Sequence, residues 1–145
     1  MKVREAMTGD VRVASPDQTI QEAARLMADC DIGSLPVGEN DRLVGMLTDR
    51  DIAVRAVADG RGPDTKIAEV MSHEVMYCFE DEDLDHVASN MGNIQVRRLP
   101  VVNRDKRLVG IVSIGDIAAC EDADKTGKAI AGISTPGGFH SQAAH

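Results

Sequence analysis

Two stretches of this chain carry nearly the same sequence. Residues 35–53 read LPVGENDRLVGMLTDRDIA, and residues 99–118 read LPVVNRDKRLVGIVSIGDIA. The Leu-Pro-Val triplets lie 64 positions apart and the Leu-Val-Gly triplets 65 apart, so the second copy has one extra residue between them. An internal repeat constrains the architecture before local propensities do. We therefore expect two copies of one unit, related by a pseudo-two-fold axis, with an interface and a cleft between them.

The repeat extends upstream of these stretches. The offset of 64 also matches the pairs Glu5/Glu69, Met7/Met71, Val11/Val75, Asp17/Asp81, Ala24/Ala88 and Met27/Met91. In each copy, a short β-prone segment precedes a helix with apolar residues at helical spacing, Ile20 to Ala28 in the first copy. A strand at Leu-Pro-Val, a turn, a second strand expected to be buried on both faces, and a second helix follow. The predicted order is β-α-β-β-α, an α/β (α+β) fold.

These elements predict the domain boundaries. We expect repeat 1 at residues 1–60, a Gly- and Pro-containing linker at 61–65, and repeat 2 at 66–122. Residues 123–145 are rich in Gly, Ser and Ala, which is typical of a flexible C-terminal tail.

The composition limits the function classes. Of 145 residues, 43% are apolar but only three are aromatic, so the core is expected to be aliphatic. The net charge of −8 argues against nucleic-acid partners, which need a basic face. No apolar run approaches the ~20 residues of a membrane span, and the N-terminal sequence lacks the apolar stretch of a secretory signal. Three cysteines and four histidines without ligand spacing indicate a reduced, cytoplasmic compartment and no metal site.

The feature with most chemical content is also duplicated. Thr48 and Asp51 follow the second strand of repeat 1, and Ser113 and Asp116 follow that of repeat 2. One interpretation is a helix capping box, which needs only a hydroxyl and an acid at this spacing. A second, compatible interpretation is a ribose-phosphate site, in which the hydroxyl faces phosphate at a helix start and the carboxylate accepts hydrogen bonds from a ribose diol.

At these residues the chain resembles a tandem pair of CBS domains, the regulatory unit called a Bateman module. The pattern apolar-Pro-Val, then Leu-Val-Gly-x-x-[Ser/Thr]-x-x-Asp-Ile, occurs twice and covers about residues 1–122. The resemblance implies two small sheets packed together and flanked by helices, with ligand sites in the cleft between the repeats. It also implies no catalytic machinery, an adenine nucleotide or related compound as regulatory ligand, no required cofactor, and a homodimer.

The resemblance also implies roles for particular residues. The ribose acceptors would be Asp51 and Asp116, with Thr48 and Ser113 facing phosphate. Basic residues just before the Leu-Pro-Val strand hold phosphate in adenylate-binding members; here that position is Arg97-Arg98 in repeat 2 but Gly33-Ser34 in repeat 1. Arg50 could add a charged contact. The residues expected to line the adenine are Arg12, Val13, Met76 and Tyr77.

Two function classes remain open at this stage. The first is a sensor that binds AMP, ADP, ATP, NAD or S-adenosylmethionine between the repeats. The second is a homodimeric interaction protein with an empty or non-nucleotide cleft, favoured by the missing base in repeat 1. An enzyme is not expected, because no nucleophile–base pair or metal set emerges. The expected dimer face comprises the second helix of each repeat, with Val54, Val57, Ile117 and Ala118.

Overall fold

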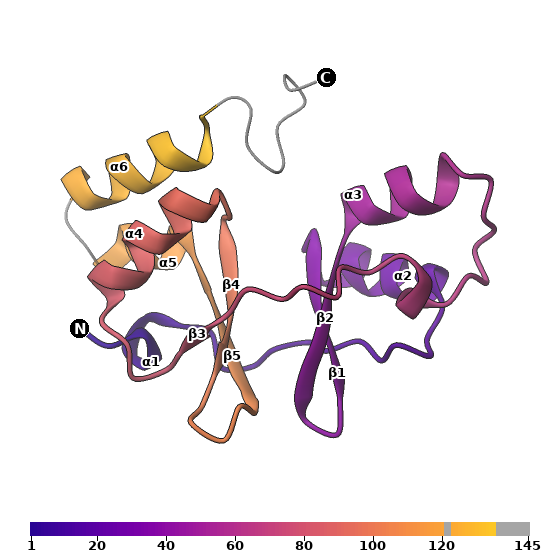
Figure 1. Ribbon diagram of the computed structural model, residues 1–145, viewed down its shortest axis with the longest axis horizontal. Helices are drawn as coiled ribbons and strands as arrows, with labels where there is room; N and C mark the ends of the chain where they lie inside the picture. The colour runs from indigo at the N-terminus through magenta and orange to yellow at the C-terminus, as the bar shows by residue number, and fades with distance from the viewer. Residues whose placement is uncertain (121–122, 136–145) are drawn as a thin grey trace. The chain divides into compact units, whose positions relative to one another are not determined.

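The computed structural model describes residues 1–120 and 123–135 (Figure 1). The chain forms two compact units. The first-repeat unit comprises Arg12–Val75 and Lys106–Leu108; the second-repeat unit comprises Met1–Val11, Met76–Asp105 and the chain from Val109 onward. Each unit combines a small sheet with flanking helices, which confirms the predicted mixed α/β class. No helix within the described ranges has the length and apolar character needed to cross a bilayer.

The first-repeat unit is a two-stranded sheet with helices. In chain order it contains α2 (Ile20–Cys30), β1 (Ser34–Glu39), β2 (Arg42–Thr48), α3 (Asp49–Asp51), the π-helical η1 (Ile52–Val57) and the 3-10 helix η2 (Ile67–Glu69). Strands β1 and β2 are antiparallel. Asn40 and Asp41 connect them with φ angles of 55° and 64°, as a type I′ turn requires. The predicted strand at 11–14 is reduced to a single parallel bridge between Ala14 and Val37.

The second-repeat unit contains the complete set of predicted elements. In chain order these are α1 (Val3–Ala6), β3 (Cys78–Phe79), α4 (Leu84–Ile94), β4 (Arg98–Val102), β5 (Leu108–Ser113), α5 (Ile114–Cys120) and α6 (Ala123–Ile133). Strand β3 runs parallel to β4, with Cys78 opposite Val101, and β5 is the other neighbour of β4. From β3 to α5 the order is β-α-β-β-α.

The first long helices of the two repeats share a left-handed C-cap, but only α2 has a side-chain N-cap. The Thr19 hydroxyl accepts a hydrogen bond from the Glu22 N–H at 3.2 Å and caps the start of α2. Helix α2 ends at Asp31 and α4 ends at Gln95, and both of these residues have left-handed backbone. The buried faces of the two helices follow the predicted apolar spacing.

The first residues of each repeat, 3–8 and 67–72, pack against the strands of the other repeat, and we call them the exchanged segments. Val3 of α1 is fully buried in the core of the second-repeat unit, and Ile67 of η2 is fully buried in that of the first-repeat unit. Backbone hydrogen bonds also join each of these segments to a strand of the other repeat. Thr8 and Ile111 exchange two N–H···O bonds of 2.9 Å, and Met46 and Ser72 exchange bonds of 3.0 and 2.9 Å. Each exchanged segment therefore covers the open edge of β5 or β2.

The glycine of each Leu-Val-Gly triplet permits this approach. A Cβ on Gly110 would lie 2.8 Å from the Thr8 carbonyl oxygen and 2.7 Å from Met7 Sδ. The same atom on Gly45 would lie 3.0 Å from the Ser72 carbonyl oxygen and closer still to the Met71 side chain. The backbone oxygens cannot move far without weakening the ladder, so a Cβ is unfavourable at both positions and most unfavourable at Gly110.

Each unit has its own core, and both cores lack aromatic residues, as expected. The first holds Ala14, Ile20, Ala23, Met27, Leu35, Val37, Leu47, Ala56, Ile67, Val70 and Met71. The second holds Val3, Cys78, Leu84, Val87, Ala88, Met91, Leu99, Val101, Val112 and Ile117. Burial raises the pKa of the Cys78 thiol to about 12, so this cysteine behaves as a small apolar residue.

Three sequence expectations need correction. Strand β2 is not buried on both faces: only Gly45 and Leu47 are buried, because helices cover one face. Ile117 is fully buried in the core and cannot belong to an exposed dimer face. Residues 123–133, expected in a flexible tail, form α6, which lies along α4 (Figure 1). Residues 136–145 of that expected tail lie outside the described residues.

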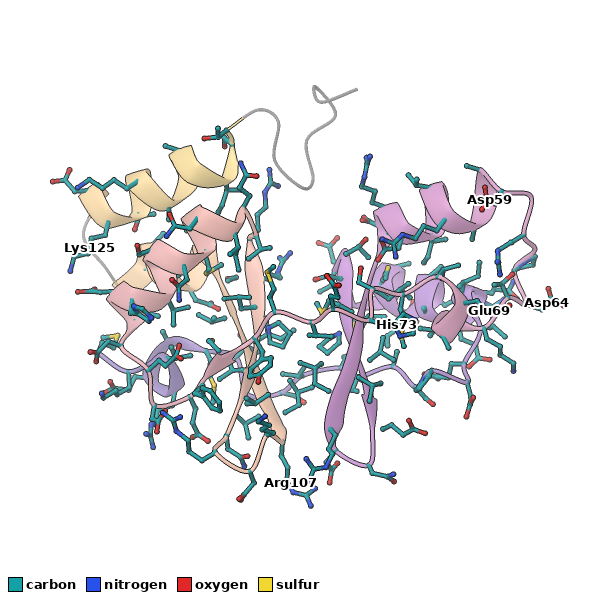
Figure 2. The ribbon with its side chains drawn as sticks, in the orientation of Figure 1. Asp59, Asp64, Glu69, His73, Arg107 and Lys125 are labelled. Atoms are coloured by element: carbon teal, nitrogen blue, oxygen red, sulfur yellow. The ribbon has the colours of Figure 1, made fainter. Side chains whose placement is uncertain are left out.

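Helix α6 reaches α4 through small residues. A Cβ on Gly132 would lie 2.6 Å from the Gly92 carbonyl oxygen, so the two backbones are in close contact. Gln95 donates to the carbonyl oxygens of Gly132 and Thr135 at 3.1 and 2.9 Å. Lys125, at the start of α6 (Figure 2), forms an ion pair with Asp85 of α4. Gly residues that suggested disorder therefore allow close helix packing.

We predict that Gly110→Ala destabilises the fold by about 1–3 kcal/mol, because the Thr8 carbonyl leaves no room for a methyl group. Gly127→Ala is the matched control. Gly127 lies inside α6 with open space around it, so this change should raise stability by about 0.5–1 kcal/mol. Urea unfolding of both variants checks this. Unchanged stability of Gly110→Ala would show that the exchanged segment does not pack as described.

Candidate ligand-binding site

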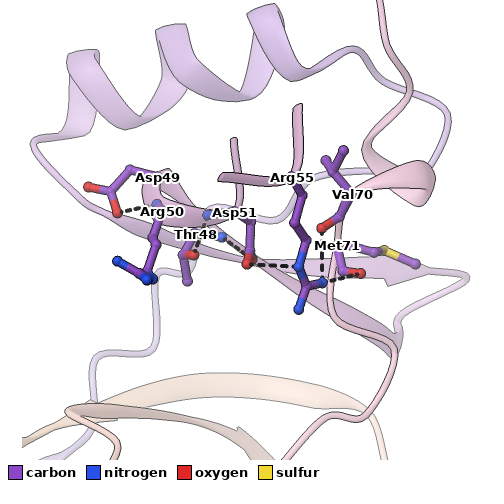
Figure 3. Close-up of polar contacts among 7 residues, drawn as sticks. All are labelled: Thr48, Asp49, Arg50, Asp51, Arg55, Val70 and Met71. Carbon is purple, nitrogen blue, oxygen red and sulfur yellow. Dashed lines mark hydrogen bonds and ion pairs between the residues drawn. The ribbon is translucent and has the colours of Figure 1, made fainter. Parts of the chain in front are cut away.

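The first hydroxyl–Asp motif lies where β2 passes into α3 (Figure 3). The Thr48 hydroxyl accepts a hydrogen bond from the Asp51 N–H at 3.0 Å, and Asp51 Oδ2 accepts one from the Thr48 N–H at 2.9 Å. This is a reciprocal capping box. Its geometry fixes the Asp51 carboxylate at the end of the strand.

The second motif has the same geometry. The Ser113 hydroxyl accepts from the Asp116 N–H at 3.1 Å, and Asp116 Oδ2 accepts from the Ser113 N–H at 2.9 Å. The capping-box interpretation is therefore confirmed in both repeats. The capping bonds still allow each motif to bind a ligand, because each carboxylate keeps acceptor sites on its second oxygen and each hydroxyl keeps a proton to donate.

The residue before the Leu-Pro-Val strand adjoins the motif in each unit. The Ile114 N–H donates to the Arg97 carbonyl at 2.9 Å, and the Asp49 N–H donates to the Gly33 carbonyl at 3.0 Å. Arg97 therefore lies beside the Ser113–Asp116 motif. Both Arg97 and Arg98 are exposed, and neither side chain makes a hydrogen bond or ion pair within residues 1–120 and 123–135.

In the first repeat the position that corresponds to Arg97 is Gly33, and an acid, Asp49, lies next to it. The Asp49 carboxylate lies 3.0 Å from the point that a Cβ on Gly33 would occupy. Its other oxygen accepts the Arg50 N–H at 2.8 Å. The Arg50 side chain is exposed and forms no hydrogen bond or ion pair with the rest of the described chain. The two motifs thus share backbone geometry but differ in adjacent charge.

A further residue, Arg55, was not identified from the sequence. Its Nε lies 3.8 Å from Asp51 Oδ1, and its Nη1 donates to the carbonyl oxygens of Val70 and Met71 at 3.3 Å each (Figure 3). The Asp51 side chain is only 15% exposed. Arg55 thus connects the motif to the exchanged segment. The i, i+4 spacing from Asp51 was the available signal, and the corresponding residue in repeat 2 is Cys120.

The residues expected to line an adenine ring are solvent-accessible. Val13, Met76 and Tyr77 are among the exposed large apolar side chains, and Arg12 is exposed as well. Tyr77 packs edge-on against Phe79, with ring centroids 5.7 Å apart. Exposed apolar side chains at these positions offer contact surface for a flat ring.

A separate charged group supports the turn after β3. Arg104 forms two hydrogen bonds with Asp81, at 2.7 and 2.9 Å, and lies 4.2 Å above the Phe79 ring. The Arg104 guanidinium lowers the pKa of Asp81 through these hydrogen bonds. Both groups are satisfied by each other, so this cluster is structural.

No set of metal-ligating side chains accompanies the motifs. Among the described residues, no three His, Cys, Asp or Glu side chains lie close enough together to hold a metal ion. The site consists of hydroxyls, carboxylates, guanidinium groups and apolar side chains.

Comparison with known proteins identifies the family. The CBS domain family matches residues 3–57 and 67–121, so the chain belongs to the CBS domain family and contains two such domains in tandem. It is 44% identical over 133 residues to the CBS domain-containing protein YhcV of Bacillus subtilis, covering 91% of this chain and 94% of that protein. It is 40% identical over 117 residues to hypoxic response protein 1 of Mycobacterium tuberculosis, covering 79% and 81%.

Solved structures show the same fold. The crystal structure of Hypoxic Response Protein I, which holds two coordinated zinc ions, matches with a TM-score of 0.74 and 37% identity, covering 82% of this chain and 98% of that one. The CBS domain pair of protein MJ0100, in complex with 5′-methylthioadenosine and S-adenosyl-L-methionine, matches with a TM-score of 0.73 and 33% identity, covering 82% and 94%.

We predict that Arg55→Ala destabilises the first-repeat unit by about 1 kcal/mol, because two carbonyl oxygens lose their donor. Arg50→Ala, in the neighbouring helix α3, is the matched control, and its stability should change by less than about 0.5 kcal/mol. Urea unfolding measures both, and hydrogen exchange at residues 70–72 should accelerate only in Arg55→Ala. Equal exchange in the two variants would contradict the role of Arg55.

Proposed function

We propose that this CBS pair is a regulatory module that binds an adenosine-containing ligand: AMP, ADP, ATP, NAD or S-adenosylmethionine. The observation that carries the proposal is the duplicated hydroxyl–Asp motif, with the Arg97 carbonyl bonded to the Ile114 N–H inside the second copy. Arg97 and Arg98 form no side-chain hydrogen bond or ion pair within residues 1–120 and 123–135. In a chain with net charge −8, two exposed arginines without an acidic partner leave cationic groups available for an anion.

The ribose is assigned to the motif carboxylates. Asp116 Oδ2 is bonded to the Ser113 N–H, which fixes the carboxylate and leaves its other oxygen for a hydroxyl group. A charged acceptor held in advance binds a diol without the cost of ordering its own side chain. Met76 and Tyr77, which belong to the same unit as Asp116 and are exposed, would supply apolar contact with the base. The MJ0100 pair, which was crystallised with two adenosyl compounds, supports this ligand class.

Catalysis is not part of the proposal. The motif residues are engaged in capping, and no acid–base or nucleophile pair adjoins them in the described chain. Binding would act instead by stabilising one arrangement of the module over another, which requires a difference in affinity between the two.

A second function is favoured by a specific observation. Val54 and Val57 of η1 are 49% and 66% exposed, and repeat 1 has Gly33-Ser34 where repeat 2 has Arg97-Arg98. A homodimeric interaction protein with an empty site would explain both. A thermal-shift panel with AMP, ATP, NAD and S-adenosylmethionine separates the two functions, because a ligand of the native state must raise the unfolding temperature.

We predict that Asp116→Ala weakens AMP binding by about 2–4 kcal/mol, because ribose hydrogen bonds to a charged acceptor are lost. Asp51→Ala should have a smaller effect on AMP, since no free arginine precedes β1. Calorimetric titration measures both variants. The lost cap costs about 1 kcal/mol of stability, so both should still fold. Unchanged AMP affinity in folded Asp116→Ala would exclude this site.

We predict a homodimer formed through η1. Light scattering should give about twice the 15.5 kDa of one chain, because exposed apolar patches on monomers are small. Val57→Asp should reduce the mass to that of one chain, whereas Ile130→Asp, which alters an exposed apolar residue of α6, should leave the dimer intact. A monomeric wild-type protein at micromolar concentration would rule out this interface.

A further inference from the structure

The four positions that surround each motif differ in charge between the repeats. Around Ser113–Asp116 they are Arg97, Arg98, Ile114 and Gly115, two bases without an acid. Around Thr48–Asp51 the corresponding residues are Gly33, Ser34, Asp49 and Arg50, one base and one acid. The backbone hydrogen bond between residues 33 and 49 corresponds to that between residues 97 and 114, so equivalent positions adjoin the two motifs but carry different side chains.

The acid of the first repeat is close to the place of the base in the second. Arg97 extends from the residue whose carbonyl accepts the Ile114 N–H at 2.9 Å. In the first repeat no side chain extends from Gly33, and Asp49 Oδ2 lies 3.0 Å from where one would begin. A guanidinium beside one carboxylate motif is thus replaced by a carboxylate beside the other.

The different charges beside the two motifs should favour ligands of different charge. A phosphate next to Asp49 would meet a like charge, and the exposed Arg50 could offset that charge but not reverse it. A neutral or cationic group next to Asp49 meets no such repulsion, and a cation is attracted. Beside Arg97 and Arg98, the same argument favours a phosphate and disfavours a cation.

Arg55, which contacts the first motif, does not neutralise the charge of Asp49. Arg55 lies 3.8 Å from Asp51 Oδ1 and uses Nη1 for the carbonyls of Val70 and Met71. Its charge is therefore directed at Asp51 and at the exchanged segment. Asp49 has no side-chain cation partner among the described residues.

We propose that the two motifs take different adenosine ligands: Ser113–Asp116 takes a 5′-phosphorylated one, and Thr48–Asp51 takes one whose 5′ substituent is neutral or cationic. This inference rests on the proposed function and adds the ligand class of each motif. The module would then report on a nucleotide and on a phosphate-free adenosyl compound through separate sites.

The test is calorimetric titration of the full chain with AMP and with S-adenosylmethionine. Arg97→Gln should weaken AMP binding about tenfold or more and change S-adenosylmethionine affinity less than about twofold. Asp49→Asn should weaken S-adenosylmethionine binding about threefold or more and leave AMP bound at Asp116 unaffected. Asn keeps an oxygen for the Arg50 N–H, so the local structure should persist.

Two matched variants control for overall charge. Arg25→Gln and Asp59→Asn remove exposed charges outside the motifs and should change neither affinity; Asp59 lies beyond η1 (Figure 2). Asp51→Ala should abolish binding of S-adenosylmethionine only, and Asp116→Ala that of AMP only.

Each other result overturns the inference in a recognisable way. If both ligands depend on the same aspartate, or if Arg97→Gln weakens them equally, the division between the motifs is wrong while adenosine binding stands. If neither ligand binds the wild-type chain in calorimetry and neither raises its unfolding temperature, the proposed function fails together with the inference.

Discussion

The fold depends on one pair of backbone interactions: the second hairpin strand of each repeat pairs with the segment that begins the other repeat. Thr8 bonds to Ile111 of β5, and Ser72 bonds to Met46 of β2. Without these segments, the edges of β2 and β5 would expose unpaired N–H and C=O groups, and each core would lack a fully buried side chain, Val3 or Ile67. The glycines at 45 and 110 fit this constraint, because a methyl group at either position would crowd the paired segment.

Strands β2 and β5 also position the residues of the candidate site. Strands β2 and β5 end at Thr48 and Ser113, and the capping boxes hold the two carboxylates at those ends. Because Arg55 joins Asp51 to the carbonyls of Val70 and Met71, the first motif is in direct contact with an exchanged segment. The second motif has Cys120 at that place and no such bridge among the described residues. The repeats are alike in backbone and different in what their motifs can sense.

Much of this could be predicted from the sequence, and the omissions have physical reasons. Helical periodicity and capping residues predicted α2 and α4, and the repeated triplets predicted the two hairpins. The exchange of segments was not predictable, because the repeat shows that Met7 and Met71 are equivalent but not which strand each one covers. Helix α6 was missed because glycine lowers helix propensity, whereas Gly132 is needed for contact with Gly92. Arg55 was missed because its partners at Val70 and Met71 are backbone carbonyls, which carry no sequence signal.

The central claim is that the motif carboxylates, already fixed by capping, are also the ribose acceptors. A crystal structure of the chain grown with AMP tests this most directly. The account predicts both ribose hydroxyls within about 2.5–3.0 Å of the Asp116 carboxylate, with the phosphate near Arg97 or Arg98. A ribose bound elsewhere, with Asp116 bonded only to the Ser113 N–H as it is here, would contradict the claim and leave the motifs as helix caps alone.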